Sequence, residues 1–146
     1  MKTLLFLCTG NYYRSRFAEE LFNALASTRL PNWRATSRAL AIEMGAANVG
    51  PISPHTLEEL KQRNLHAIDP DRPPVQCTVE DLKEAILIIA LKEEEHRPML
   101  VSRFPGWSDK VTYWHIHDVD QDHPSNALAE IAKNVEHLID ELDLSA

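Results

Sequence analysis

The chain has 146 residues, of which 44% are hydrophobic and 25% charged, and its formal net charge is -7 at pH 7. This composition is typical of a globular protein, and a chain of this length buries about 68–70% of its unfolded surface on folding. No cluster of Lys and Arg stands out, so we expect neither a nucleic-acid partner nor an anionic membrane partner. We expect residues 1–146 to form a single domain.

Two further features point to the cytoplasm. The apolar run at residues 4–7 is too short for a signal peptide or a transmembrane helix. The two cysteines, Cys8 and Cys77, lie far apart and do not have the dense pattern of a secreted disulfide scaffold. We therefore expect a cytoplasmic protein with no membrane contact.

Patterns typical of strands and of helices alternate along the chain. Apolar runs predict strands at residues 3–7, 33–40, 86–91 and 110–116. Apolar residues at helical spacing predict helices at residues 15–26, 54–64, 92–104 and 126–142. Thr78, followed three residues later by Asp81, has the pattern of a further helix start. The sequence thus predicts a three-layer α/β fold, an open sheet of four parallel strands with helices on both faces and the strand at 86–91 at its centre.

Residues 8–15, with the sequence CTGNYYRS, lie where the first predicted strand meets the first predicted helix. In open α/β sheets, ligands bind outside the carboxyl ends of the strands. Backbone N–H groups of such a loop can converge on an anion, helped by the helix N-terminus. Arg14 adds a planar, permanent charge that matches two phosphate oxygens. We therefore predict a phosphate site after the first strand, with the backbone from Thr9 to Ser15 as its cradle.

Cys8 is the candidate nucleophile at the bottom of this cradle. The N–H dipoles and Arg14 favour its thiolate, which can attack a bound phosphorus atom. Ser15 can donate a hydrogen bond to the sulfur when the sulfur leaves. Gly10 permits close backbone approach, and Asn11 can brace the loop through its side chain. The alternative is that Cys8 is a small buried residue at a strand end, but its neighbours favour phosphoryl transfer through a cysteinyl-phosphate.

These residues resemble the signature of the low-molecular-weight protein tyrosine phosphatases: cysteine, a variable residue, glycine-asparagine, two further residues and arginine-serine, close to the N-terminus. Ser37, the segment NVGPIS at residues 48–53 and the segment ILIIALKEEEHRPML at residues 86–100 extend the resemblance over the whole chain. The resemblance implies a phosphomonoester hydrolase that acts on a phosphorylated protein or a small aryl phosphate, with phosphotyrosine as the family substrate. It implies no metal and no organic cofactor.

Three residues depart from the family pattern. Tyr13 stands where many members have a second cysteine, and Arg16 replaces a common proline. Tyr12 occupies a position that usually carries a smaller apolar residue. We expect Tyr12 and Tyr13 to shape the rim of the substrate pocket, with Trp114 or the loop at Asn48 as further walls.

The family uses an aspartate shortly after the fourth strand as its general acid. The corresponding segment here holds Asp118, Asp120 and Asp122. We expect Asp118, the closest to the strand end, to protonate the leaving group, with Asp120 as the alternative. Asp122 would then serve the start of the last helix. Three histidines alternate with these aspartates: His115, His117 and His123. No second cluster at ligand spacing accompanies them, so we expect no metal site.

Two other functions share the same loop. A catalytically weak phosphoryl-binding regulator would account for the missing Asp-Pro pair and the two tyrosines, although an anion binder does not need the thiol. A thioredoxin-coupled arsenate reductase needs further cysteines after the third strand, and Cys77 precedes that strand, where it is expected to be a packed thiol. A P-loop nucleotide binder is excluded, because the sequence has no G-x4-G-K-[ST] motif.

Overall fold

The computed structural model describes residues 1–118 and 121–145. Strands (β), α-helices (α) and short 3-10 helices (η) follow in this order: β1 (Lys2–Cys8), α1 (Arg14–Arg29), β2 (Trp33–Ala39), η1 (Ile42–Gly45), α2 (Pro54–Gln62), α3 (Val79–Glu84), β3 (Leu87–Ala90), α4 (Glu93–Arg103), η2 (Ser108–Lys110), β4 (Thr112–Tyr113) and α5 (Pro124–Leu144). Thr78 and Asp81 form the capping box that begins α3. The alternation of strands and helices expected from the sequence is confirmed.

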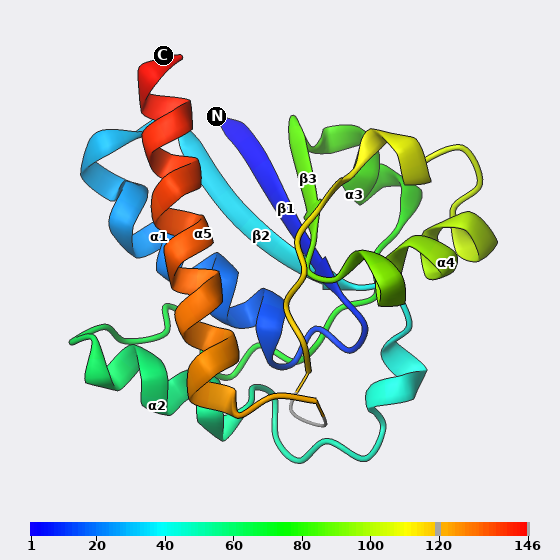
Figure 1. Ribbon diagram of the computed structural model, residues 1–146, viewed down its shortest axis with the longest axis horizontal. Helices are drawn as coiled ribbons and strands as arrows, with labels where there is room; N and C mark the ends of the chain where they lie inside the picture. Colours follow the sequence, from blue (N-terminus) through cyan, green and yellow to red (C-terminus); the bar gives the residue numbers. More distant parts are fainter. Residues whose placement is uncertain (119–120, 146) are drawn as a thin grey trace.

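The four strands form one parallel sheet in the order β2-β1-β3-β4 (Figure 1). Leu4 of β1 pairs with Ala35 of β2 on one side and with Leu87 of β3 on the other. The predicted sheet of four parallel strands is therefore confirmed. The strand predicted at its centre, β3, shares the interior of the sheet with β1.

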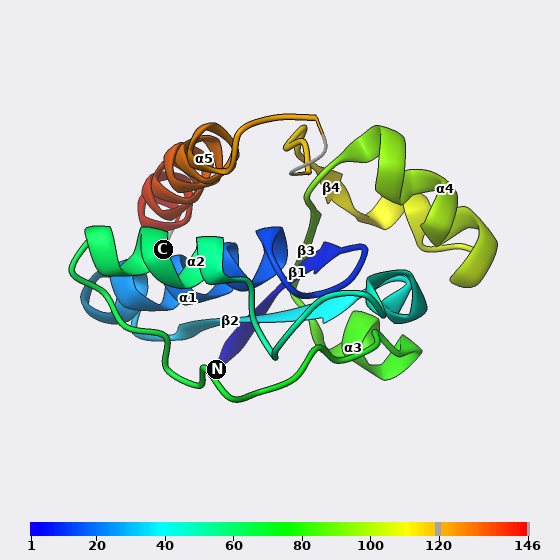
Figure 2. The ribbon, with the colours of Figure 1, turned by 90° about the horizontal axis from the view of Figure 1, so that it is seen from below.

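The apolar run of β1 explains the three layers, because alternate side chains of a strand point to opposite faces of the sheet. Leu4 and Phe6 lie in one buried cluster with side chains of α1, α2 and α5. Leu5 and Leu7 lie in a second cluster with side chains of α3 and α4. Figure 2 shows α1, α2 and α5 on one side of the sheet and α3 on the other. Helices therefore cover both faces, as the sequence predicted.

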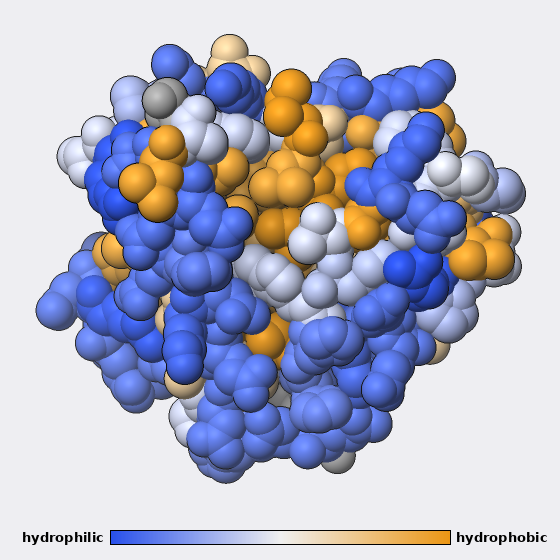
Figure 3. Space-filling view, turned by 45° about the horizontal axis from the view of Figure 1, so that its top comes forward, coloured by the Kyte–Doolittle hydropathy of each residue, from blue (hydrophilic) through white to orange (hydrophobic). Residues whose placement is uncertain are grey.

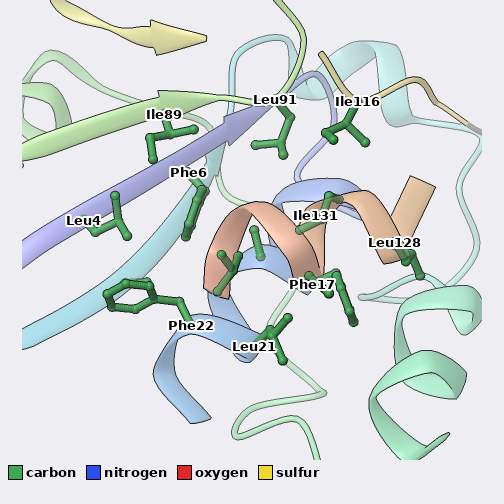
Figure 4. Packing of buried hydrophobic residues seen from close by; sticks show 14 of the residues in the cluster. Leu4, Phe6, Phe17, Leu21, Phe22, Ile89, Leu91, Ile116, Leu128 and Ile131 are labelled. Atoms are coloured by element: carbon green, nitrogen blue, oxygen red, sulfur yellow. The ribbon is translucent and has the colours of Figure 1, made fainter. Parts of the chain in front are cut away.

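The larger cluster fixes the direction of α1. Phe6 of β1 packs edge-on against Phe22 of α1, with ring centroids 6.5 Å apart (Figure 4). The inward face of α5 closes the same cluster with Leu128, Ile131, Val135 and Ile139. With α1 held against β1 in this way, the N-terminus of α1 lies at the carboxyl end of the strand, where the phosphate loop is expected.

The fourth strand is shorter than predicted. The sequence indicated a strand at 110–116, but only Thr112–Tyr113 pair with β3, which itself ends at Ala90. Beyond Tyr113 the chain still follows the end of β3, because Trp114 N donates to Ala90 O at 2.9 Å and Ile116 N donates to Leu91 O at 2.8 Å. Trp114 O also accepts from Glu93 N of α4 at 3.0 Å, and the chain then leads to the segment that holds Asp118.

The surface at the amino ends of the strands differs from the rest. Figure 3 shows apolar side chains gathered on this face, surrounded by hydrophilic residues. A hollow between β3, β4 and α5 is lined there by Leu87, Trp114, Leu138 and Leu142. Within the described part of the chain, no helix has the length and apolar character needed to cross a lipid bilayer.

Candidate active site

The loop at residues 8–15 joins the carboxyl end of β1 to the N-terminus of α1, as the sequence predicted. Cys8 is 3% exposed, and its Sγ lies 2.9 Å from Ser15 Oγ. Tyr13 occupies the N-cap position of α1, and among the described residues no side chain caps this helix end. The first N–H groups of α1 are therefore available to an anion beside the sulfur.

Asn11 is the residue that shapes the loop. Its backbone has a φ of 52°, in the left-handed region that Asn tolerates better than most residues. Its Nδ2 donates to Ser15 Oγ and to Ser37 Oγ, both at 2.9 Å. Its Oδ1 accepts from Val75 N at 3.1 Å and from Arg72 Nη1 at 3.3 Å. These four contacts brace the loop as predicted.

Ser15 links this brace to the nucleophile. Because Ser15 Oγ accepts a hydrogen bond from Asn11, its own hydroxyl hydrogen can point at Cys8 Sγ. A donor in this position stabilises negative charge on the sulfur. The geometry thus suits the predicted role of Ser15 beside a thiolate.

A second arginine on α1 ties the loop to distant segments. Arg16 is fully buried and donates to the backbone carbonyls of Pro51, Asp69 and Arg72 at 2.9–3.2 Å. Burial, together with the charge of Arg72, lowers the pKa of Arg16. Arg16 thereby positions the segment from which the Arg72 side chain reaches Asn11. The sequence did not indicate this role.

Arg14 is held in one orientation by acceptors from two other elements. It is 2% exposed, and its Nη1 donates to Ile116 O at 2.9 Å and to Glu95 Oε1 at 3.2 Å. Its Nη2 donates to Glu95 Oε2 at 2.8 Å. Burial by itself would lower the pKa of Arg14, but the hydrogen bond to Glu95 and the nearby charges of Cys8, Glu95 and Asp118 together outweigh it and raise the pKa. A bidentate carboxylate therefore sets the plane of the guanidinium group.

Glu95, on the first turn of α4, is a site residue that the sequence analysis missed. Thr9 Oγ1 donates to its Oε2, and His96 Nε2 lies 3.2 Å from the same oxygen. His96 Nδ1 accepts from Lys92 N at 3.0 Å, so the hydrogen is on Nε2 and points at Glu95. Burial would raise the pKa of Glu95, but hydrogen bonds from His96 and Arg14 outweigh it and lower the pKa. Glu95 is therefore an ionised anchor for Arg14.

His96 supports Glu95 from inside the protein. It is fully buried, and burial together with the charge of Arg14 lowers its pKa, so the ring is neutral. The position of Glu95 and His96 in the sequence could have indicated their role. They lie in the first turns of the helix that follows β3, and β3 lies beside β1 in the sheet. Three successive glutamates at residues 93–95 gave no reason to choose one of them.

A cavity of about 270 Å³ opens above the loop. Cys8, Arg14 and Asp118, the three residues predicted to be catalytic, all line it. Asp118 Oδ2 lies 3.5 Å from Arg14 Nη2. The structure thus brings the candidate nucleophile, phosphate ligand and acid together. Asp120, the alternative acid, lies outside the described residues.

The two tyrosines and residues near α2 form the walls of the cavity. Tyr12 lines it and donates its hydroxyl to Val49 O at 2.6 Å. Tyr13 is 6% exposed, packs edge-on against the His55 ring and donates to Pro124 O at 3.3 Å. Burial, with the charge of Asp118 adding to it, raises the pKa of Tyr13 to about 12. Tyr13 therefore stays protonated at neutral pH.

Other wall residues follow the expectation only in part. Asn48 and Gly10 line the cavity, as expected for that loop and for the cradle. A Cβ at Gly10 would meet Asn48 Nδ2 at 3.6 Å, an ordinary contact, so any requirement for glycine there would come from the bound ligand. Trp114 is not a cavity wall: it packs on Phe6, with ring centroids 5.6 Å apart. The Trp114 ring instead lies against the buried cluster that contains Phe6, on the side of the sheet covered by α5.

The remaining candidate groups lie apart from the cavity. Cys77 is buried in the cluster under α3 and α4, on the face of the sheet opposite to Cys8, and burial raises its pKa to about 12. Asp122 accepts from His123 N and Asn126 Nδ2 at the start of α5, as expected. Within residues 1–118 and 121–145, no group of three or more His, Cys, Asp or Glu side chains could hold a metal ion.

Comparisons with known proteins agree with this geometry. A model of the family described as low molecular weight phosphotyrosine protein phosphatase matches residues 3–143. A protein-arginine-phosphatase of Bacillus subtilis is 29% identical over 108 residues, which are 74% of this chain and 67% of that protein. A low molecular weight protein tyrosine phosphatase from T. tengcongensis superposes with a TM-score of 0.76, 28% identity and full coverage of both chains. An arginine phosphatase from Geobacillus stearothermophilus gives a TM-score of 0.78 at 25% identity, covering 99% of this chain and 95% of that one.

Proposed function

The chain belongs to the low molecular weight phosphotyrosine protein phosphatase family and is a cysteine-dependent phosphatase, and we propose that it hydrolyses phosphotyrosine in proteins with Cys8, Arg14 and Asp118 as its catalytic residues. One observation carries this proposal: the sulfur and the guanidinium of the loop at residues 8–15 line the same cavity as a carboxylate from a segment about 100 residues further along the chain. Thr9, Gly10, Asn11, Tyr12, Tyr13 and Ser15 complete the binding loop.

In the first step the Cys8 thiolate attacks the phosphorus atom of the substrate. A bond forms between sulfur and phosphorus, and the bond from phosphorus to the phenolic oxygen breaks. Asp118, in its protonated form, gives its proton to the departing oxygen, an effect typically worth about 10²–10⁴-fold. The products of this step are the free tyrosine side chain and a cysteinyl-phosphate.

In the second step a water molecule attacks the phosphorus atom. The Asp118 carboxylate formed in the first step takes a proton from this water, and the sulfur–phosphorus bond breaks. Ser15 Oγ, 2.9 Å from the sulfur, donates a hydrogen bond to the returning thiolate. Inorganic phosphate leaves, and both Cys8 and Asp118 are back in their starting states.

Arg14 and the loop backbone bind the phosphoryl oxygens in both steps. The contacts of Glu95 with both Nη atoms hold the guanidinium in place before the substrate arrives. Such preorganised donors stabilise developing charge without reorganisation during the reaction. Glu95 and Asp118 also offset the charge of Arg14, so backbone N–H groups from Thr9 to Ser15 carry a large share of phosphate binding.

The walls of the cavity support an aromatic substrate. The rings of Tyr12, Tyr13 and His55 surround the entrance, and planar side chains favour a planar aryl group. A second candidate is phosphoarginine, the substrate class named for the Bacillus subtilis relative. A specific feature favours it too, because the Asp118 carboxylate beside the phosphate site could bind a guanidinium group.

Hydrolysis of a chromogenic aryl phosphate tests the catalytic residues. We expect Cys8→Ser to reduce turnover to the background rate and Asp118→Asn to lower kcat/KM by ~10²-fold or more. Cys77→Ser and Asp122→Asn are the matched controls and should stay within about twofold of the wild type. No turnover by the wild-type protein would instead support a phosphoryl-binding regulator.

Two peptides of one sequence, carrying phosphotyrosine or phosphoarginine at the same position, test the substrate class. We expect kcat/KM to be at least ~10-fold higher for the phosphotyrosine peptide, a difference of about 1.4 kcal/mol in transition-state binding. The opposite preference would establish the second candidate and leave the mechanism unchanged. We further propose that the chain forms a single domain, which its one four-stranded sheet supports. We also propose that it works in the reducing cytoplasm, which its two free thiols support.

A further inference from the structure

Lys92 is a buried cation where three parts of the fold meet. It follows β3, directly precedes α4 and is 6% exposed. Its backbone N–H donates to His96 Nδ1 at 3.0 Å, and it forms an isolated antiparallel bridge with His115. Lys92 therefore lies between the helix that carries Glu95 and the segment that leads to Asp118.

The side chain of Lys92 contacts Gln121, three residues after Asp118 in the sequence. Its Nζ donates to Gln121 Oε1 at 2.6 Å. An ammonium group removed from water needs a firm acceptor, and a charge-assisted hydrogen bond of this length provides one. Gln121 itself is exposed, so the buried lysine is the fixed end of this contact.

Gln121 is coupled to Asp118 through the backbone. Gln121 N donates to Asp118 O at 3.0 Å, and Asp122 N donates to the same oxygen at 3.2 Å. The carbonyl of Asp118 is therefore tied to the backbone of both Gln121 and Asp122. A restraint on Gln121 is therefore also a restraint on the residue whose carboxylate lines the cavity beside Arg14.

We propose that Lys92 is a positioning residue for the general acid and acts through Gln121 to hold Asp118 toward the leaving-group oxygen. This inference rests on the proposed role of Asp118. It has a consequence that packing alone would not produce. A poor leaving group needs the proton and thus a well-placed acid, whereas a good leaving group departs without it.

The test is kcat/KM across a series of aryl phosphates, from phenyl phosphate to 2,4-dinitrophenyl phosphate. This parameter reports formation of the cysteinyl-phosphate, the step in which the acid acts. For Lys92→Met and for Gln121→Leu we expect a loss of ~10-fold with phenyl phosphate and of less than about threefold with the dinitrophenyl ester. Lys83→Met, a substitution of an exposed lysine on α3, should leave the whole series unchanged within about twofold.

Asp118→Asn separates a failure of this inference from a failure of the proposed function. A steep dependence on the leaving group in Asp118→Asn, with equal losses across the series in Lys92→Met and Gln121→Leu, would overturn the positioning role and keep the acid. A flat series in Asp118→Asn would overturn the acid assignment, and the inference with it.

A double variant adds a check on the path of the effect. If Lys92 acts through Asp118, Lys92→Met should add no further selectivity for the leaving group in an Asp118→Asn background. Additional selectivity there would overturn the proposed path. Should Lys92→Met fail to fold, Gln121→Leu carries the same test, because it removes the same hydrogen bond at an exposed position.

Discussion

The two sides of the cavity are built in different ways. The side with the phosphate loop comes from one continuous stretch, residues 8–15, in which Asn11 makes four polar contacts. The opposite side depends on segments about 80 and 100 residues further along, which carry Glu95, in contact with Arg14, and Asp118, which lines the cavity. Local backbone geometry shapes the first side, whereas the second depends on how β3 and β4 end beside β1.

Arg14 joins the two sides. It belongs to the loop in sequence, but its hydrogen bonds go to Glu95 and to Ile116 O on the opposite side. The two sides also differ in charge: the loop offers N–H donors and a thiol, and the opposite side offers carboxylates. A substitution on the loop side should therefore change phosphate binding through the loop backbone. A substitution on the opposite side should change it through the position of Arg14.

The largest effect on the free energy of unfolding is expected at Asn11. Asn11→Ala removes four side-chain hydrogen-bonding contacts and places alanine, which tolerates the left-handed region less well than asparagine, at a φ of 52°. The lost contacts cost about 1–3 kcal/mol and the left-handed backbone about 1–2 kcal/mol, so we expect the free energy of unfolding to fall by about 3 kcal/mol. A displaced Ser15 should also lower kcat/KM by ~10²-fold. Urea unfolding and aryl phosphate hydrolysis measure the two effects.

Asn64 provides a matched control, because it has a φ of 61° at an exposed position after α2. Asn64→Ala should cost only the backbone contribution, about 1–2 kcal/mol, and leave kcat/KM unchanged. Asn11→Gly should show the cost of the lost side-chain contacts alone, since glycine accepts the left-handed backbone angle but makes no side-chain contact. If Asn11→Ala proved no more harmful than Asn64→Ala, the loop would not depend on its brace.

A smaller effect is expected at Glu95, on the side built from distant segments. Glu95→Gln keeps the shape but can no longer accept from both Nη atoms of Arg14. Hydrogen bonds to charged groups contribute about 1.5–3 kcal/mol, so we expect kcat/KM to fall by about 10- to 100-fold. Glu94→Gln, in the same helical turn but exposed, should stay within about twofold. Equal effects of the two substitutions would mean that helix charge, and not the contact with Arg14, is what matters.

The pH dependence of stability sharpens the test of Glu95. Its pKa is lowered in the folded protein, because hydrogen bonds from His96 and Arg14 outweigh burial. A lowered pKa stabilises the fold above the unfolded value of about 4.3 and loses this contribution as the pH falls below it. The difference in free energy of unfolding between wild type and Glu95→Gln should therefore be largest near neutral pH and shrink on acidification. A difference that grew with acid would contradict the ionised anchor.

The same contrast explains what the sequence could predict. The loop was predictable because Cys8, Arg14 and Ser15 lie within one short stretch, residues 8–15, with a predicted strand before it and a predicted helix after it. The sheet was predictable because a fully apolar strand such as β1 needs cover on both faces. Asp118 could be chosen because it is the first of three aspartates after the last predicted strand, and the structure places it on the cavity with Cys8.

What could not be predicted depends on contacts between distant segments. Glu95 is one of three successive glutamates. Only its contacts with Thr9 and Arg14, which depend on how α4 packs near the end of β1, distinguish it from the other two. Arg16 stood out in the sequence only as a replacement of a common proline, yet it is fully buried and donates to three backbone carbonyls of distant segments. The strand predicted at 110–116 is only Thr112–Tyr113, because a 3-10 helix takes residues 108–110 and regular pairing with β3 ends where β3 itself ends, at Ala90.

The smallest effect is expected at Cys77, on the opposite face of the sheet from Cys8. Burial raises its pKa to about 12, so at pH 8 it is a protonated thiol with little reactivity. Iodoacetamide should modify one thiol of the native protein, Cys8, and inorganic phosphate should protect it. Cys77→Ala should leave kcat/KM unchanged and lower the free energy of unfolding by about 1 kcal/mol. Loss of turnover in Cys77→Ala, or modification of both thiols in the native protein, would contradict this prediction. Either result would favour a redox reaction between the two cysteines, and thus the arsenate reductase alternative.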